Sequence, residues 1–307
     1  MMMRQTTELN GIKISWEVHS QKRNPSGAPL VVLIAGLGQA SHHWPEPMIE
    51  GLTGAGFEII TFDNRDVGMS SKCPGDQQQI PGKLFRQIME GEQVNPPYTL
   101  NEMADDTIAL IRNYLEGKPT KQVHLIGISM GGAIGQLVAL KHPELIHSLT
   151  CMMSHTGDSK VGKATPEAQA VLTSKPSSPD REGYISWRLD CARVLAGKGY
   201  PLDEAYVERK AATTWDQGYD YTGVTRQLLA IYTSGNRRDK LASLEVPTLV
   251  LHGEDDPLIA MDAGSQIASM VPKARLKVFP GWGHDLPELL VPELVDEITT
   301  FIKSYNQ

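Results

Sequence analysis

Cysteine is scarce in this sequence, with three residues, Cys73, Cys151 and Cys191, in a chain of 307. The number is odd, and none of the three stands in a C-x-x-C pair or at a Cys/His ligand spacing, which argues against a disulfide framework and a thiolate metal site. A chain of this length buries enough surface to fold without such supports. We therefore expect reduced thiols, a cytoplasmic protein and no bound metal.

Long apolar runs and clusters of positive charge are also missing. The first residues lack the apolar core of a signal peptide, and no later stretch reaches the roughly 20 apolar residues that cross a membrane. The formal net charge is −7, and no basic run is longer than a pair such as Arg237-Arg238, which excludes a general binder of nucleic-acid phosphates. Neither G-x-G-x-x-G nor a P-loop lysine follows a predicted strand. The expected partner is a small molecule, with no nucleotide cofactor.

The most informative segment begins at Val123, where an apolar run predicts a buried strand. A G-x-S-x-G sequence follows it, and an apolar helical pattern comes next. Gly127 and Gly131 permit a turn too tight for side chains on either side of it, and they leave Ser129 at its apex. The new helix directs its unpaired N–H groups, Met130 first, at whatever the serine attacks. This pattern indicates a nucleophile with an oxyanion donor beside it.

A nucleophilic serine needs an imidazole to take its proton and a carboxylate to orient that imidazole. The loop after the last predicted strand ends in G-x-G-H, and its glycines leave it free to aim the ring of His284. Two adjacent acids follow the preceding strand, and a proline after the second biases Asp256 toward an extended conformation. Asp256 is the predicted acid, and Asp255 and the more distant Asp158 are the alternatives.

The chain order serine, acid, histidine resembles that of the α/β-hydrolase superfamily. The stretch His252-Gly-Glu-Asp-Asp-Pro257 is similar to the family's H-G-x-x-D-x pattern, which implies Asp256 as the acid. Four motifs are similar to those of its bacterial group of aclacinomycin methylesterases and related natural-product esterases and lactonases, macrolide-ring esterases among them: Asp63-Asn-Arg-Asp-Val-Gly68, Gly127-Ile-Ser-Met-Gly-Gly132, Thr156-Gly-Asp158 and Gly281-Trp-Gly-His-Asp-Leu-Pro287. The resemblance covers nearly the whole chain. It implies an α/β-hydrolase fold with a mostly parallel sheet flanked by helices. Residues 1–158 and 241–307 would form its core, and residues 159–240 an inserted helical cap.

The resemblance also implies where the rest of the oxyanion hole lies. After the strand that ends near residue 35, the family carries a His-Gly pair followed by a donating residue. This chain has Ala35 in place of the histidine and keeps Gly36, so the Leu37 N–H is the expected second donor. The loop after the following predicted strand, residues 63–70, resembles the family's D-x-R-G-x-G-x-S, with Asp66 in place of its first glycine. There the resemblance implies that Asp63 and Arg65 buttress the oxyanion strand.

Candidate substrate contacts come from the loop near the oxyanion strand and from the cap. Residues 159–240 contain six of the nine tyrosines together with Trp187 and Trp215, a content that suits the roof of a pocket and the cap's own core alike. We expect Trp187, Trp215, Gly36 and His42 to contact the substrate. For His42 the alternative is a solvated helix start, because a second histidine stands beside it on a loop.

Residues 71–98 form a long connection interrupted by prolines. Loops of this length in a compact domain are commonly lids or binding loops. One short amphipathic stretch within the connection carries an apolar face made of Leu84, Phe85, Ile88 and Met89. The connection is either a lid over the pocket or a surface excursion held down by that face.

These features predict a serine-dependent carboxylic ester hydrolase that works through an acyl-enzyme and needs no cofactor. Family members that displace a group at carbon use aspartate where this chain has Ser129, so acyl transfer is favoured. The aromatic cap suits a bulky natural-product ester or macrolactone such as a macrolide. The alternatives are a hydrolase of small esters or enol lactones with perhydrolase side activity, and a ligand-binding receptor of the same fold with a slow triad. The sequence predicts no oligomeric state.

Overall fold

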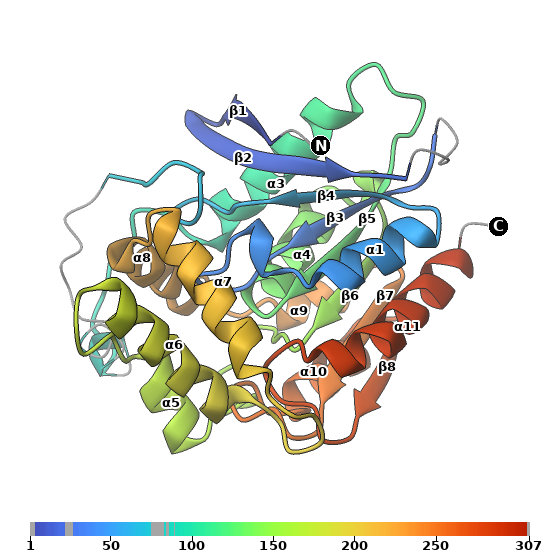
Figure 1. Cartoon of the computed structure of the whole chain (residues 1–307). Helices are drawn as coiled ribbons and strands as arrows, with labels where there is room; N and C mark the ends of the chain where they lie inside the picture. Colours follow the sequence, from blue (N-terminus) through green and yellow to red (C-terminus); the bar gives the residue numbers. More distant parts are fainter. Residues whose placement is uncertain (1–3, 22–26, 75–82, 84–85, 89, 306–307) are drawn as a thin grey trace.

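The computed structural model describes residues 4–21, 27–74, 83, 86–88 and 90–305. Within them the chain forms an eight-stranded sheet in the order β1-β2-β4-β3-β5-β6-β7-β8 (Figure 1). The strands are β1 (Gln5–Leu9), β2 (Ile12–His19), β3 (Leu30–Ile34), β4 (Glu58–Phe62), β5 (Val123–Ile128), β6 (Ile146–Met152), β7 (Thr248–Gly253) and β8 (Ala274–Phe279). β2 pairs antiparallel with β1 and with β4, and the other neighbours pair parallel. The mostly parallel sheet confirms the predicted α/β class.

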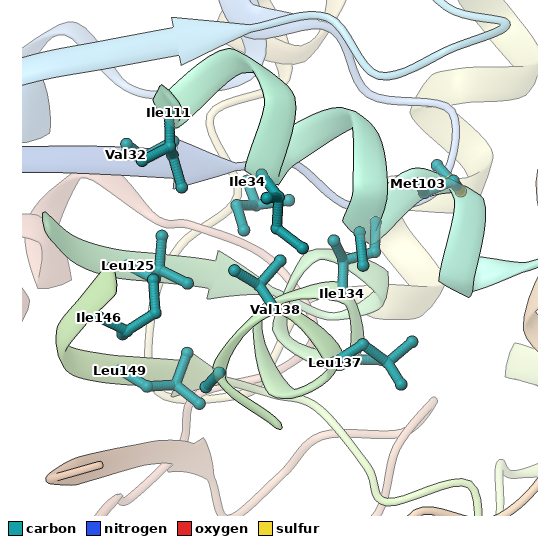
Figure 2. Packing of buried hydrophobic residues seen from close by; sticks show 14 of the residues in the cluster. Val32, Ile34, Met103, Ile111, Leu125, Ile134, Leu137, Val138, Ile146 and Leu149 are labelled. Carbon is teal, nitrogen blue, oxygen red and sulfur yellow. The ribbon is translucent and has the colours of Figure 1, made fainter. Parts of the chain in front are cut away.

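Helices cover both faces of the sheet. They are α1 (Glu46–Gly54), α3 (Leu100–Leu115), α4 (Met130–Lys141), α10 (Asp262–Met270) and α11 (Val291–Lys303). Successive residues of β3 point to opposite faces, so Val31 and Leu33 belong to the apolar cluster of α1 and α11. Val32 and Ile34 belong to the cluster of α3 and α4, whose side chains meet in Figure 2. Each fully buried side chain of this kind contributes about 1.5–3 kcal/mol to folding.

A group of helices is inserted between β6 and β7, and Figure 1 shows α5 to α8 gathered on one side of the molecule. They are α5 (Pro166–Leu172), α6 (Arg181–Leu195), α7 (Glu204–Asp216), α8 (Tyr221–Thr233) and the short α9 (Arg238–Leu241). Each of the first four begins after a threonine or aspartate whose side chain accepts a hydrogen bond from a backbone N–H of the first turn: Thr165, Asp180, Asp203 and Asp220. Such N-caps fix where a helix starts and stabilise it by about 1 kcal/mol.

Asp66 joins α8 to the sheet. Its backbone has φ 75°, in the left-handed region that favours glycine. Its buried carboxylate accepts hydrogen bonds from Arg226 of α8, through Nε at 2.8 Å and Nη2 at 2.7 Å. The Tyr98 hydroxyl and the Cys73 N–H donate to the same carboxylate. An aspartate at this position therefore has a strained backbone that glycine would avoid. It also forms a buried ion pair between the core and an inserted helix.

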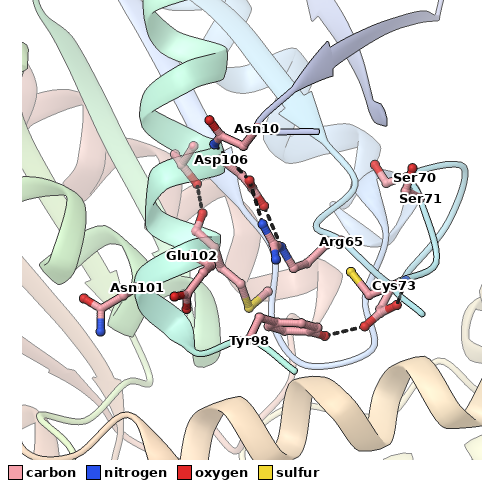
Figure 3. A network of polar contacts seen from close by, with 12 residues as sticks. Asn10, Arg65, Ser70, Ser71, Cys73, Tyr98, Asn101, Glu102 and Asp106 are labelled. Carbon is pink, nitrogen blue, oxygen red and sulfur yellow. Dashed lines mark hydrogen bonds and ion pairs between the residues drawn. The ribbon is translucent and has the colours of Figure 1, made fainter. Parts of the chain in front are cut away.

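Asp63 and Arg65 make buried contacts that agree with the buttressing role implied for them. The Asp63 carboxylate accepts the Ser41 N–H at 2.7 Å and pairs with Arg4 at 2.6 Å. Arg65 binds Asp106 of α3 through two hydrogen bonds of 2.7 and 2.8 Å, and Figure 3 shows its guanidinium between Asp106 and the ring of Tyr98. These contacts hold the loop after β4 to the neighbouring elements.

The predicted apolar face of the 71–98 connection lies mostly outside the described residues. Leu84, Phe85 and Met89 are not described. Ile88 is described, and it lines a large cavity that also contains Ser129, here called the main cavity. The lid and the surface excursion therefore both remain predictions. In the described part of the chain, no helix combines the length and the apolar character needed to cross a membrane.

Candidate active site

Ser129 stands at the turn between β5 and α4. Its backbone has φ 54° and ψ −116°, a strained conformation for a residue with a side chain. Both flanking positions must be glycine. A Cβ at Gly127 would lie 2.3 Å from the Gly131 carbonyl oxygen, and one at Gly131 would lie 2.0 Å from the Ile34 carbonyl oxygen. The turn therefore has the tight geometry that its sequence predicts, and Ser129 lines the main cavity.

The structure brings Ser129, His284 and Asp256 into one hydrogen-bonded chain. His284 Nε2 lies 3.1 Å from Ser129 Oγ, and His284 Nδ1 lies 2.8 Å from Asp256 Oδ2. An ionised Asp256 only accepts, so Nδ1 carries the imidazole proton and Nε2 is free to accept the serine proton. These side chains follow β5, β8 and β7, and they meet because parallel strands end at the same edge of a sheet.

Asp256 is held by its own loop as well as by the histidine. Its Oδ1 accepts the N–H groups of Leu258 at 2.9 Å and Ile259 at 2.8 Å. Burial alone would raise the pKa of this carboxyl, but the charge and hydrogen bond of His284, with the backbone donor, bring its pKa below the ordinary 3.8. The carboxylate is therefore ionised at neutral pH and fixed in the orientation that the imidazole requires.

The two alternative acids are placed elsewhere. The Asp158 carboxylate accepts from Gln266 Nε2 at 2.9 Å and from the Lys160 N–H at 3.0 Å, and it lies 3.6 Å from Arg238. Asp255 donates its N–H to the Trp282 carbonyl at 3.1 Å, and its carboxylate has no hydrogen bond within the described residues. Of the three candidate acids, Asp256 is the one that the structure places against His284.

The expected oxyanion donors lie beside the serine. A Cβ at Gly36 would be 3.5 Å from Ser129 Cβ, so the loop that carries Leu37 runs close to the nucleophile. Met130 is the first residue of α4, and both Leu37 and Met130 line the cavity. Within the described residues, neither N–H donates to a protein acceptor. Both donors are therefore available to an oxygen bound at Ser129.

The Leu37 loop is tied to α8. The N–H of Gly38 donates to Gln227 Oε1 at 2.9 Å, and the same side chain donates to the Arg65 carbonyl at 2.7 Å. The N–H of Gly36 donates to Gln39 Oε1 at 3.2 Å. An inserted helix therefore helps to set the position of the oxyanion loop.

A cavity of about 1020 Å³ opens above these residues. Its floor includes Gly36, Ser129 and His284, and its other walls come largely from α5, α6, α7 and α8. Trp187 lines it, as expected, with its indole N–H donating to Ser174 Oγ at 2.7 Å. The space is large and mainly apolar, which suits a bulky ligand.

For two predicted substrate contacts the structure corrects the sequence. His42 is not among the lining residues, because its Nε2 is 3.0 Å from Thr214 Oγ1, and the neighbouring His43 lines the cavity in its place. Trp215 is also absent from the lining. Its ring packs against Tyr184 and stacks on Tyr219, with centroids 5.7 and 6.3 Å apart, and so belongs to the packing among the inserted helices.

His155 and Asp285 are cavity residues to which sequence reasoning gave no role at the site. His155 follows β6, and its Nδ1 accepts the Gly157 N–H at 2.8 Å. Burial, reinforced by the charge of Arg237, lowers the pKa of His155 to about 3, so the ring is neutral. Burial raises the pKa of Asp285 to about 6, and its Oδ1 has no partner in the described chain. In the sequence, the features that could have indicated a place at the site are the position of His155 at the end of a strand and that of Asp285 directly after His284.

Comparison with known proteins agrees with this fold. A family model described as the alpha/beta hydrolase fold matches residues 29–289. A rhodomycin D methylesterase of Streptomyces peucetius is 26% identical over 284 residues, which is 86% of this chain and 87% of that protein. The structure also resembles a meta-cleavage product hydrolase of Pseudomonas fluorescens, with a TM-score of 0.74, 17% identity and 98% of both chains covered. For a Rhodococcus esterase the TM-score is 0.70, with 21% identity and 99% of both chains covered.

Proposed function

Because the chain belongs to the alpha/beta hydrolase fold family, we propose that it is a serine hydrolase that cleaves carboxylic esters through an acyl-enzyme. The observation that carries this proposal is the hydrogen-bonded chain from Ser129 through His284 to Asp256 at the floor of a large cavity. An imidazole held between a hydroxyl and an ionised carboxylate is the arrangement that activates a serine. The free cysteines support a cytoplasmic location for this enzyme.

The proposed reaction has two halves. Ser129 Oγ attacks the ester carbonyl while His284 Nε2 takes its proton, and the N–H groups of Leu37 and Met130 donate to the oxyanion that forms. His284 then returns the proton to the departing alcohol, which leaves an acyl group on the serine. A water molecule, deprotonated by the same imidazole, releases the acid and restores the serine. Asp256 keeps Nδ1 protonated throughout and stabilises the imidazolium.

We propose a bulky natural-product ester or macrolactone, macrolides included, as the substrate. The cavity volume of about 1020 Å³ lies at the upper end of the range for small-molecule sites, and a small acetyl ester would fill little of it. Residues 159–240 would act as the cap that roofs this space. The similarity to a rhodomycin D methylesterase supports a methyl ester of a natural product as one such substrate. Contacts remote from the reacting carbonyl can then help to orient it.

The test is a panel of methyl esters, lactones and macrolides assayed with the wild-type protein and the Ser129→Ala variant. The wild type should hydrolyse large esters with a higher kcat/KM than p-nitrophenyl acetate. Ser129→Ala should lower kcat by roughly a million-fold, because no acyl-enzyme can form. Its thermal unfolding should match that of the wild type, which separates a lost nucleophile from a lost fold. If the variant keeps a few per cent of wild-type turnover, the proposed mechanism is wrong.

A further inference from the structure

Helix α6 runs along the cavity and leads away from the catalytic histidine. The Leu195 carbonyl, at its last turn, accepts the His284 N–H at 2.8 Å. One face of the helix lines the cavity: Tyr184, Trp187, Arg188, Cys191, Ala192 and Leu195. Arg188 lies seven residues before Leu195 in the sequence, which places it about 10 Å further along the helix axis at 1.5 Å per residue. Arg188 therefore stands in the cavity wall, about two helical turns before the residue that contacts His284.

Arg188 has no acidic partner within the described chain. The recorded contact of its guanidinium is with the neighbouring Trp187, whose ring centroid is 5.6 Å away. Arg193 and Arg226 of the inserted helices are paired, with Glu204 at 2.8 Å and with Asp66 at 2.7 Å, whereas Arg209 of α7, also without an ion pair in the described chain, is exposed and lies outside the cavity lining. A charge in a half-buried wall is costly unless an opposite charge or acceptors satisfy it. Its five donors in a planar fork match a carboxylate.

The groups around Arg188 are neutral at pH 7 and cannot supply the missing charge. The charge of Arg188 acts on His43, Tyr184, Cys191 and Tyr219. Burial lowers the pKa of His43 well below 6.5, so its ring is uncharged. Burial raises the pKa of Tyr184, Cys191 and Tyr219, so they stay protonated. These four side chains therefore leave the positive charge of Arg188 uncompensated.

Unsatisfied polar atoms occur in the same walls. The hydroxyls of Tyr219 and Tyr206 are buried without a hydrogen-bond partner among the described residues, and both residues line the cavity. Tyr219 lies against Tyr184, with ring centroids 4.2 Å apart, and so belongs to the surroundings of Arg188. A buried hydroxyl without a partner costs about 1–3 kcal/mol, which a ligand oxygen would recover.

We propose that Arg188 and the Tyr219 hydroxyl form a subsite for a carboxylate carried at the far end of the substrate, about 10 Å from the contact between α6 and His284. The inference rests on the proposed ester hydrolysis, and it narrows the substrate class to bulky esters that also bear an acid. The guanidinium would bind the carboxylate through two parallel hydrogen bonds, and the aromatic side chains would pack on the apolar spacer.

The experiment compares two rigid substrates. One is the monomethyl ester of para,para-biphenyl dicarboxylic acid, which has its ester and its acid at opposite ends of two rings. The other replaces the acid with a neutral carboxamide. Both are assayed with the wild type, Arg188→Gln, Arg188→Lys and Tyr219→Phe. Arg181→Gln is the matched control, because Arg181 is a cation of the same helix that pairs with Asp216 at 2.9 Å outside the cavity.

The wild type should prefer the acid over the carboxamide by about 10- to 100-fold in kcat/KM, mainly through KM, as expected for a charged hydrogen bond. Arg188→Gln should bring this ratio close to one. Arg188→Lys should keep part of the preference, because lysine retains the charge without the fork. Tyr219→Phe should reduce the ratio less than Arg188→Gln, and Arg181→Gln should leave it at the wild-type value.

A wild-type ratio near one, or a ratio that survives in Arg188→Gln, would overturn the subsite. Calorimetric binding of the biphenyl diacid to wild type and Arg188→Gln needs no turnover, so it tests the subsite separately from the reaction. If no ester is hydrolysed but the diacid binds more than 10-fold tighter to the wild type, the subsite holds and the proposed function fails. Equal binding to the two proteins refutes the subsite even if esters are cleaved.

Discussion

Replacing Asp66 with glycine sets two effects of opposite sign against each other. Glycine relieves the strain of φ 75°, which is worth about 1 kcal/mol for an aspartate. It also removes the carboxylate that accepts two hydrogen bonds from Arg226. Removing one partner of a buried pair costs about 3–5 kcal/mol, because the other charge is left uncompensated. The lower end of this range applies here, because Asp220 remains 3.2 Å from Arg226 and compensates part of its charge.

The net expectation is a loss of about 2 kcal/mol in the free energy of unfolding, and a fall of several degrees in Tm for a chain of this size. Equilibrium unfolding in urea, followed by tryptophan fluorescence and circular dichroism, measures it. Arg226→Met in the Asp66→Gly background removes the stranded charge and should recover most of the loss, whereas Arg226→Met alone should be destabilising. The four proteins form a double-mutant cycle, and its coupling energy reports the pair itself.

Two results would refute this reasoning. If Asp66→Gly is as stable as the wild type or more so, backbone strain outweighs the ion pair. If Arg226→Met fails to rescue Asp66→Gly, the loss comes from the Tyr98 and Cys73 contacts and not from the stranded arginine. Ester turnover by the folded fraction is a separate measurement, because α8 also contacts the oxyanion loop through Gln227.

Three further predictions concern the site. Asp256→Asn should lower kcat about ten-thousand-fold by leaving the imidazole in the wrong tautomer, whereas Asp255→Asn should be mild; the reverse order would move the acid by one residue. Trp187→Ala should reduce kcat/KM more for a large ester than for p-nitrophenyl acetate, whereas Trp215→Ala should affect both esters equally; steady-state kinetics separates the two. His155 has a pKa lowered to about 3, so it stays neutral in the folded chain while the unfolded chain protonates it below 6.5. Its contribution to stability is therefore present above pH 6.5 and is lost as pH falls toward 3. Urea unfolding at pH 7 and pH 5 measures this: between the two pH values the free energy of unfolding should fall by about 1–2 kcal/mol less in His155→Asn than in the wild type. An equal fall in the two proteins would refute the assignment.

The sheet and the residues of the triad could be predicted because their signals are local. A strand, a G-x-S-x-G turn and a helix fix where Ser129 lies, and the same sheet edge collects the loops of Asp256 and His284. The choice of Asp256 over Asp255 rested on the family's H-G-x-x-D-x pattern and on the extended bias that Pro257 imposes. None of these steps needed contacts between distant segments.

The substrate contacts could not be assigned in this way. His42 and His43 are neighbours in a one-turn 3-10 helix, Ser41–His43, where successive side chains point about 120° apart. Thr214, far along the chain, lies near both rings, 3.0 Å from His42 Nε2 and 3.4 Å from His43 Nε2, so which ring lines the cavity depends on tertiary contacts that the local sequence does not indicate. Trp215 lies in the same aromatic-rich segment as Trp187, yet it packs on Tyr184 and Tyr219 and does not line the cavity. Aromatic content indicates that a cap needs rings and does not say which of them the ligand meets.

Arg188 lies between these two cases. In a helix, the residues three and four positions away are the neighbours that could pair with a cation. For Arg193 one of them is Asp190, and the two form an ion pair of 3.0 Å. For Arg188 the corresponding positions carry tyrosine, isoleucine, cysteine and alanine, none of which is charged. The sequence could therefore have marked Arg188 as a cation without a local partner. Only the fold adds that it faces a cavity and that no distant acid in the described chain reaches it, which turns an unpaired charge into a candidate for ligand recognition.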